Sequence, residues 1–99
     1  SEREPDLKIV PNEGYTDLRE DGTPYVIASG AIVNPTSQTV AVPDLLVTLK
    51  DAGGRAVYSW KIKPKVRSLA PGGRTEFSEL RLDVPRSAKQ TVIGWVLRD

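Results

Sequence analysis

Residues 45–63 read LLVTLKDAGGRAVYSWKIK, and this stretch decides the fold class. Its first half places Leu45, Val47 and Leu49 on one face of a strand, because side chains alternate between the two faces with a period of two. The glycines at positions 53 and 54 accept the positive φ angles that a tight hairpin turn requires. After the turn the alternation resumes, with Ala56, Tyr58, Trp60 and Ile62 on one face. The stretch therefore predicts a β-hairpin.

Two further runs are apolar on both faces, namely Tyr25–Asn34 (YVIASGAIVN) and Gln90–Arg98 (QTVIGWVLR). Strands with two apolar faces are typical of the covered centre of a fold. We therefore expect Tyr25–Asn34 to be a central strand that is covered on both sides. Gly30 lies inside this run and predicts either a bulge or a close approach by other backbone.

The rest of the chain also favours short strands over helices. Eight glycines and eight prolines leave too few uninterrupted stretches of the roughly 10–12 residues that a helix needs. Further strands are expected at Asp6–Val10, Gln38–Val42 and Arg74–Leu82, with an Asp-Gly hairpin turn inside Leu18–Thr23. In Arg74–Leu82, Phe77 and Leu80 are three residues apart, so placing both on one face of a strand requires a bulge. This pattern predicts an all-β sandwich or barrel.

Length and composition exclude several classes of chemistry. Ninety-nine residues suit one domain, which we place over residues 1–99 with residues 1–5 as a lead-in outside the fold. The chain has no Cys and no His, so it lacks disulfides, thiolate chemistry, cysteine-based zinc sites and a Ser-His-Asp triad. No cofactor is expected. Because the chain also lacks Met and begins at Ser1, we interpret it as a processed or excised piece of a longer protein.

Charge is distributed unevenly along the chain although the net charge is only +1. The first 49 residues hold three basic and eight acidic side chains, whereas the remaining residues hold eleven and five. Such an asymmetry can mark a nucleic-acid or membrane surface. We favour the alternative that the two halves interleave in the folded domain, and a pI of 8.0 is below that of a dedicated nucleic-acid binder. Sequence-specific nucleic-acid binding is therefore not expected.

The order of turns and core residues resembles that of a bacterial domain family of unknown function. The matching segments are Gly30–Asn34, Val42–Leu45, Thr48–Arg55, the strand with Trp60, Leu69–Gly73, the strand with Phe77, and Leu82–Pro85. They are similar to the C-terminal domain of proteobacterial proteins that carry an N-terminal zinc ribbon and one transmembrane helix, and to immunoglobulin-like modules of the FxLYD type.

The resemblance implies an Ig-like antiparallel β-sandwich of about six to eight strands. It also implies a periplasmic or other extracytoplasmic location, with the domain tethered to the inner membrane by a helix outside this chain. It implies no enzymatic activity. The zinc ribbon cannot be carried over, since this chain has neither Cys nor His.

The candidate interaction surface is a run of alternating cations, Lys61, Lys63, Lys65 and Arg67. These side chains can meet acidic lipid headgroups, a polyanion or an acidic protein. The structural alternative, which we favour, is that Lys and Pro on an edge strand prevent unwanted pairing with other strands. Because Tyr58 and Trp60 point to the opposite face, the cations lack an aromatic platform for base stacking.

Three other groups of residues are candidate sites. The aromatic residues Tyr58, Trp60, Phe77 and Trp95 can line a groove, but core packing is the favoured interpretation. Asp17, Glu20 and Asp21 can bind calcium, but their spacing does not fit an EF-hand and turn formation explains them. Glu76, Glu79 and Asp83 can form an acid/base pair, but salt bridges to Arg74 and Arg81 are favoured.

These observations favour a non-catalytic extracytoplasmic interaction module of a membrane-anchored bacterial protein. Its expected partner is a protein or an envelope polymer, and it contacts the membrane only through the tether. A structural spacer or homo-oligomerisation domain is the alternative, because apolar residues beyond the needs of one core can form an interface. A small hydrolase that uses only carboxylates is the least favoured hypothesis.

Overall fold

The computed structural model describes residues 3–14 and 16–97, and this part of the chain contains nine strands and no helix. The all-β prediction is confirmed. The strands are β1 (Lys8–Pro11), β2 (Thr16–Leu18), β3 (Pro24–Val33), β4 (Val40–Ala41), β5 (Leu45–Lys50), β6 (Ala56–Ile62), β7 (Ser68–Leu69), β8 (Arg74–Leu82) and β9 (Gln90–Trp95). The count exceeds the expected six to eight because it includes β4 and β7, two strands of only two residues each at one end of the molecule.

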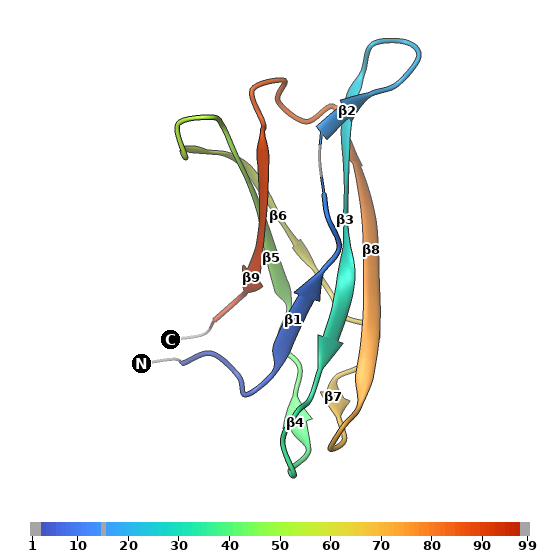
Figure 1. Cartoon of the computed structure of the whole chain (residues 1–99), viewed down its shortest axis with the longest axis vertical. Coiled ribbons are helices and arrows are strands. Elements are labelled where there is room, and N and C mark those ends of the chain that lie inside the picture. Colours follow the sequence, from blue (N-terminus) through green and yellow to red (C-terminus); the bar gives the residue numbers. More distant parts are fainter. Residues whose placement is uncertain (1–2, 15, 98–99) are drawn as a thin grey trace.

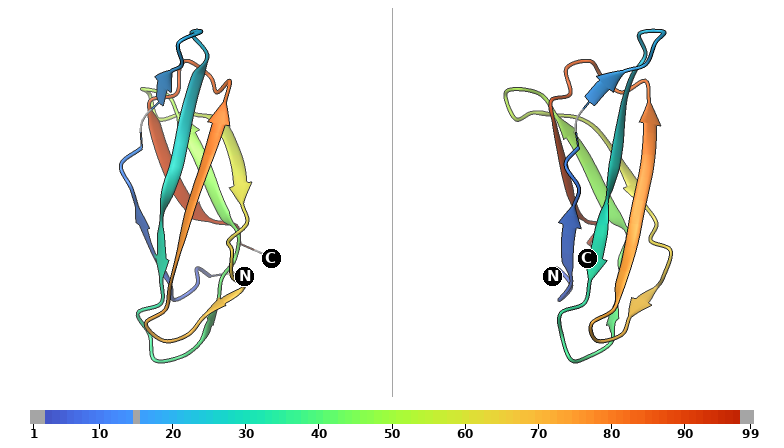
Figure 2. Two further views of the ribbon diagram at one scale, coloured as in Figure 1. Left: turned by 90° about the vertical axis from the view of Figure 1, so that its right-hand side faces the viewer. Right: turned by 45° about the vertical axis from the view of Figure 1, so that its right-hand side comes forward.

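Seven of the strands form two antiparallel sheets that pack face to face (Figure 1), and β4 and β7 form a separate two-stranded sheet. In the first sheet β3 is central, with β8 along one edge and both β1 and β2 along the other. The second sheet has the order β6-β5-β9. β4 pairs with β7 where the chain passes between the layers, and Figure 2 shows this short pair at the end opposite the β2–β3 hairpin. The molecule is therefore a two-layered β-sandwich.

The core lies between the two sheets and follows the alternation of the strands. In β5, the side chains of Leu45, Val47 and Leu49 are fully buried, as expected from the 45–63 hairpin. Val26 and Ile32 of β3 face them from the other sheet. Burial of each such aliphatic side chain contributes about 1.5–3 kcal/mol, so this layer makes a large contribution to the stability of the sandwich.

At Gly30 the backbone of β1 lies close to β3. A Cβ atom at this position would lie 2.5 Å from the carbonyl oxygen of Val10 and 2.8 Å from the Cα atom of Pro11. Both atoms belong to the backbone of β1, which cannot move aside without losing its pairing with β3. The sequence-based expectation of a close approach at Gly30 is confirmed.

Gly30→Ala should therefore destabilise the domain by about 2 kcal/mol or more, because the added methyl group overpacks a rigid backbone contact. Gly94→Ala is the matched control, since a Cβ atom at Gly94 has no heavy atom within 4 Å. Urea denaturation of the two variants measures the difference. Equal stabilities would contradict the assignment of Gly30 as a packing constraint.

Two expectations for the first sheet are wrong. The outer face of β3 is not covered along its length: Ile27 on this face is 46% exposed, although Ala31 on the same face is buried. β8 contains no bulge, because its pairing with β3 runs without a break from Tyr25↔Leu82 to Val33↔Arg74. Phe77 is buried while Leu80 is exposed, so the two side chains simply occupy opposite faces. In the final predicted strand, Arg98 lies outside the described residues.

Asn34 follows β3 and is the one fully buried polar residue among the described residues. Its Nδ2 atom donates hydrogen bonds to the carbonyl oxygens of Gln38 (2.7 Å), Leu69 (2.9 Å) and Ala70 (3.2 Å). Its Oδ1 atom accepts hydrogen bonds from the backbone N–H (2.9 Å) and the hydroxyl (2.8 Å) of Thr36. One side chain thus joins the segment after β3 to the end of β7 and the residue that follows it.

Asn34→Ala should cost about 3 kcal/mol, because it removes all of these bonds at once, among them the buried bond to the carbonyl oxygen of Leu69. Asn12→Ala is the control, since Asn12 is exposed and its side chain makes one bond, to the Ser29 hydroxyl at 3.0 Å. It should cost less than about 0.5 kcal/mol. Thermal unfolding followed by circular dichroism compares the two, and similar losses would refute the role given to Asn34.

Candidate functional site

The outer surface of the first sheet carries a cluster of exposed apolar side chains, which we call the outer apolar face. The exposed fractions are 53% for Leu18, 46% for Ile27, 55% for Leu80 and 44% for Leu82. Half-buried Tyr25 completes the cluster. The register of β3 and β8 assembles it, because Tyr25 lies opposite Leu82 and Ile27 lies opposite Leu80.

The outer apolar face is a shallow hollow of about 560 Å³ whose rim is charged. Arg19 and Glu20, from the turn between β2 and β3, line the hollow together with the apolar residues. This turn is the predicted Asp-Gly hairpin turn. It is closed by a hydrogen bond from the Arg19 N–H to the Thr23 carbonyl oxygen at 2.9 Å, with Gly22 at a φ of 87°. An apolar centre with a polar rim is the usual composition of a protein-binding surface.

Sequence reasoning missed this surface, although a signal for it was present. The three-residue spacing of Phe77 and Leu80 indicated a bulge only on the assumption that both side chains face the core. Without a bulge, this spacing places Leu80 on the outer face of the sheet. The apolar residues on both faces of Tyr25–Asn34 carried the same information.

The predicted cations lie along the edge of the second sheet. Lys61 is on β6, and Lys63, Lys65 and Arg67 follow the end of that strand at Ile62. All four residues are exposed. Within the described residues β6 pairs only with β5, so it is an edge strand, as the structural alternative requires. The strand ends before Lys63, so the last three cations are not held on one strand face, and Arg67 lines a separate hollow with Asp44.

Trp60 is held in place by two charged residues of β8. Its Nε1 donates a hydrogen bond to the Glu79 carboxylate at 3.2 Å, and the Arg81 guanidinium carbon lies 5.2 Å from the centre of its ring. Glu79 and Arg81 are two residues apart, so both point from β8 towards the second sheet. The core interpretation is confirmed for Trp60 and Phe77, which are 7% and 6% exposed. Tyr58 and Trp95 are half-buried against the same core.

This contact predicts different effects for two substitutions of Glu79. Glu79→Gln retains an oxygen acceptor for the indole N–H and should change stability by less than about 0.5 kcal/mol. Glu79→Ala leaves the N–H without its partner and should cost about 1–2 kcal/mol. Chemical denaturation followed by tryptophan fluorescence measures both. If the two variants lose the same stability, the hydrogen bond does not anchor Trp60.

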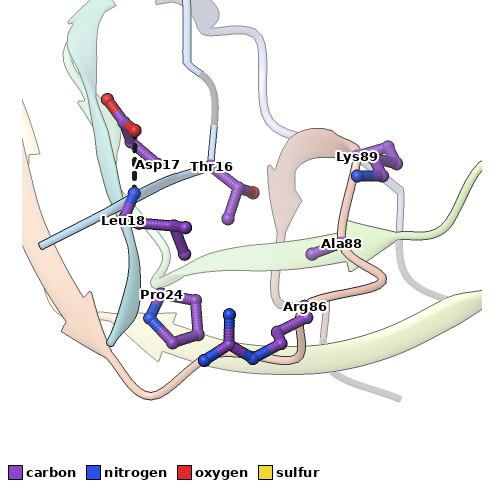
Figure 3. Close-up of a pocket in the computed structure, with 7 residues that line it drawn as sticks. All are labelled: Thr16, Asp17, Leu18, Pro24, Arg86, Ala88 and Lys89. Carbon is purple, nitrogen blue, oxygen red and sulfur yellow. Dashed lines mark hydrogen bonds between the residues drawn. The ribbon is translucent and has the colours of Figure 1, made fainter. Parts of the chain in front are cut away.

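A second hollow, of about 340 Å³, lies between β2 and the connection from β8 to β9 (Figure 3). Two of its polar side chains bond to the backbone. The Asp17 carboxylate accepts a hydrogen bond from the Leu18 N–H at 2.8 Å, and the Arg86 Nη2 donates to the Gly22 carbonyl oxygen at 2.9 Å. Asp17 and Arg86 are therefore held by the backbone, and Thr16 and Lys89 are the other polar side chains that line this hollow.

Asp21, one of the acidic residues of the β2–β3 turn, bonds to the backbone. The Asp21 carboxylate accepts a hydrogen bond from the Thr23 N–H at 2.9 Å, and this bond holds the pKa of Asp21 below its ordinary value. Because the folded state favours the ionised carboxylate, the stability that it contributes to the turn is lost as the pH falls through this lowered pKa. Within residues 3–14 and 16–97 no three acidic residues form a metal-binding group.

The acidic residues of β8 do not act as a pair. Glu76 faces outwards and forms a salt bridge to Arg74 at 3.2 Å, as predicted. Glu79 faces inwards to Trp60, so the predicted salt bridge to Arg81 is replaced by the bond to the indole. An odd spacing on an unbroken strand places Glu76 and Glu79 on opposite faces of the sheet.

Comparison with protein families, curated proteins and solved structures finds no match to this chain. The resemblance noted from the sequence therefore stays a prediction. In the part of the chain that the structure describes, no helix has the length and apolar character needed to span a membrane.

Proposed function

We propose that this chain is a non-catalytic, Ig-like interaction module that acts outside the cytoplasm as part of a membrane-anchored bacterial protein. The observation that carries the proposal is the outer apolar face. Leu18, Ile27 and Leu80 each expose about half of their surface there. Leu80 and Ile27 are cross-strand neighbours, so the exposed area is continuous. Contiguous apolar patches with polar rims mark interaction sites on soluble domains.

The expected partner at this face is a protein with a matching apolar surface. Removing aliphatic side chains from water contributes about 25 cal/mol per Å² of buried area, and this is the driving force that the face offers. The rim adds one charge of each sign, Arg19 and Glu20. A partner with the opposite arrangement of charges would be oriented by them.

The cations Lys61, Lys63, Lys65 and Arg67 are a second candidate surface, for an acidic partner or an envelope polymer. Their exposure supports this proposal. Their position at the edge of the sheet also supports protection of β6 against strand pairing. The outer apolar face is the stronger candidate, because its residues are fixed by the register of two long strands. A spacer or homo-oligomerisation role is the alternative function.

The test is capture of partners from a bacterial envelope extract with the immobilised domain. Leu80→Glu should reduce the captured partner at least about tenfold, since it buries a charge in the apolar contact. Its effect on stability should be below about 0.5 kcal/mol, because Leu80 is 55% exposed.

Two matched variants control this experiment. Ser78→Glu places the same charge on the same exposed face of β8 outside the cluster, and it should retain the partner. Lys61→Glu/Lys63→Glu reverses the cations and tests the second surface. If Leu80→Glu leaves the partner bound and Lys61→Glu/Lys63→Glu releases it, the binding site lies at the cations and not at the outer apolar face. No captured protein for the unmodified domain would contradict the proposal.

A further inference from the structure

The edge of β9 differs from every other long edge in the described residues. β6 carries Lys61, and Lys63-Pro64 follows it; β1 contains Lys8 and Pro11; β8 contains four charged residues. Charges and prolines of this kind prevent edge strands from pairing with other chains. β9 reads QTVIGW and contains neither a charge nor a proline. Its composition therefore leaves pairing unopposed.

The backbone of β9 has hydrogen-bonding groups directed away from the domain. The Val96 N–H donates to the Asp44 carbonyl oxygen at 2.8 Å, just past the end of the ladder between β5 and β9. Backbone groups alternate in direction along an antiparallel strand. Val92 and Gly94 therefore also face β5, whereas Thr91, Ile93 and Trp95 direct their N–H and C=O groups outwards. Within the described residues no strand pairs with this side of β9.

We propose that β9 pairs with β9 of a second copy of this chain in an antiparallel arrangement centred on Ile93. This register places Ile93 opposite Ile93 of the second copy and Thr91 opposite Trp95 of the second copy. All three outward-facing residues are then used, and each pair exchanges two hydrogen bonds, about six in total. A register shifted by one residue towards either end leaves one of these residues outside the paired stretch.

The side chains around this register are compatible with self-pairing. Val92, which is 37% exposed, lies opposite Gly94 of the second copy on the outer surface. A Cβ atom at Gly94 has open space around it in the single chain, so this position leaves room for the facing valine. Lys89 lies opposite Leu97 of the second copy, so like charges do not meet. The result is one six-stranded sheet in the order β6-β5-β9-β9-β5-β6.

This pairing is independent of partner binding at the outer apolar face, which belongs to the other sheet. Sedimentation of the unmodified domain over about a hundredfold range of concentration should show a reversible monomer–dimer equilibrium. Leu80→Glu should leave this equilibrium unchanged. If the domain does not dimerise, the proposed function is therefore unaffected. If no partner binds at the outer apolar face, the proposed dimer is likewise unaffected.

Charge pairs at positions 92 and 94 test the register directly. In Val92→Glu/Gly94→Glu, the carboxylate introduced at position 92 meets the one introduced at position 94 of the second copy, and like charges in facing positions destabilise a strand pair. Dimerisation should fall at least about tenfold, and Val92→Lys/Gly94→Lys should behave in the same way. An equimolar mixture of the two variants should dimerise again, because each facing pair then joins a carboxylate to an ammonium group. Both sites face solvent, and circular dichroism checks that each variant is folded.

Hydrogen exchange provides a test that needs no variant. The amides of Thr91, Ile93 and Trp95 should become protected as the protein concentration rises, whereas those of Val92 and Gly94 should be protected at every concentration. A domain that stays monomeric over the whole range would overturn the proposal. A dimer that Val92→Glu/Gly94→Glu leaves intact, or a mixture of folded variants that stays monomeric, would overturn it as well.

Discussion

The side chain of Asn34 is the interaction on which the closure of the sandwich depends. The chain passes between the two layers after β3 and again after β6, and both connections run through the same end of the molecule (Figure 1). Asn34 donates to carbonyl oxygens in both connections. The neighbouring backbone adds two bonds, from the Asn34 N–H to the Gly73 carbonyl oxygen and from the Gly72 N–H to that of Asn34, each 2.9 Å long. The burial of one amide therefore fixes how the layers meet.

The two lateral sides of the sandwich are closed in different ways. On the side of β6 and β8, Trp60 fills the space between the layers. The Glu79 carboxylate accepts a hydrogen bond from its N–H, and the Arg81 guanidinium lies over its ring. Two charged side chains thus face inwards there while remaining partly exposed to water. Among the described residues, no buried side-chain nitrogen or oxygen atom lacks a hydrogen-bond partner. On the side of β1 and β9, apolar residues and half-buried Trp95 form the boundary. This asymmetry leaves one edge strand protected by charge and the other unprotected.

Local sequence patterns predicted the elements that depend on neighbouring residues alone. The 45–63 hairpin, the turn at Gly22 and the close approach at Gly30 follow from alternation and from the special conformations of glycine. The exposure of the cations from Lys61 to Arg67 was predicted for the same reason. The prediction that Ala56 shares a face with Trp60 was wrong, because the pairing of β5 with β6 shifts register between Leu49 and Lys50 and leaves Ala56 exposed. The division between edge and central strands agreed for β6 and β3.

The outer apolar face was not predicted, because coverage is a property of the layers. A strand can be central within its sheet, with neighbours on both edges, and still have one uncovered face. β3 is such a strand: it is paired along its length, while Ile27 faces solvent. The inward position of Glu79 and Arg81 was missed for a related reason, since only the packing of Trp60 against β8 makes the interior side of that strand suitable for charge.

The pairing of β3 with β8 has a consequence for biosynthesis. Even the nearest partners in this ladder, Val33 and Arg74, are about 40 residues apart in the sequence, and such non-local pairings form slowly. β8 completes the first sheet and β9 completes the second, so neither sheet can close before the segment from Arg74 onwards has been synthesised. While the chain grows on the ribosome, the edge of β3 that pairs with β8 therefore has no partner. Assembly of this domain is a late event in its own translation.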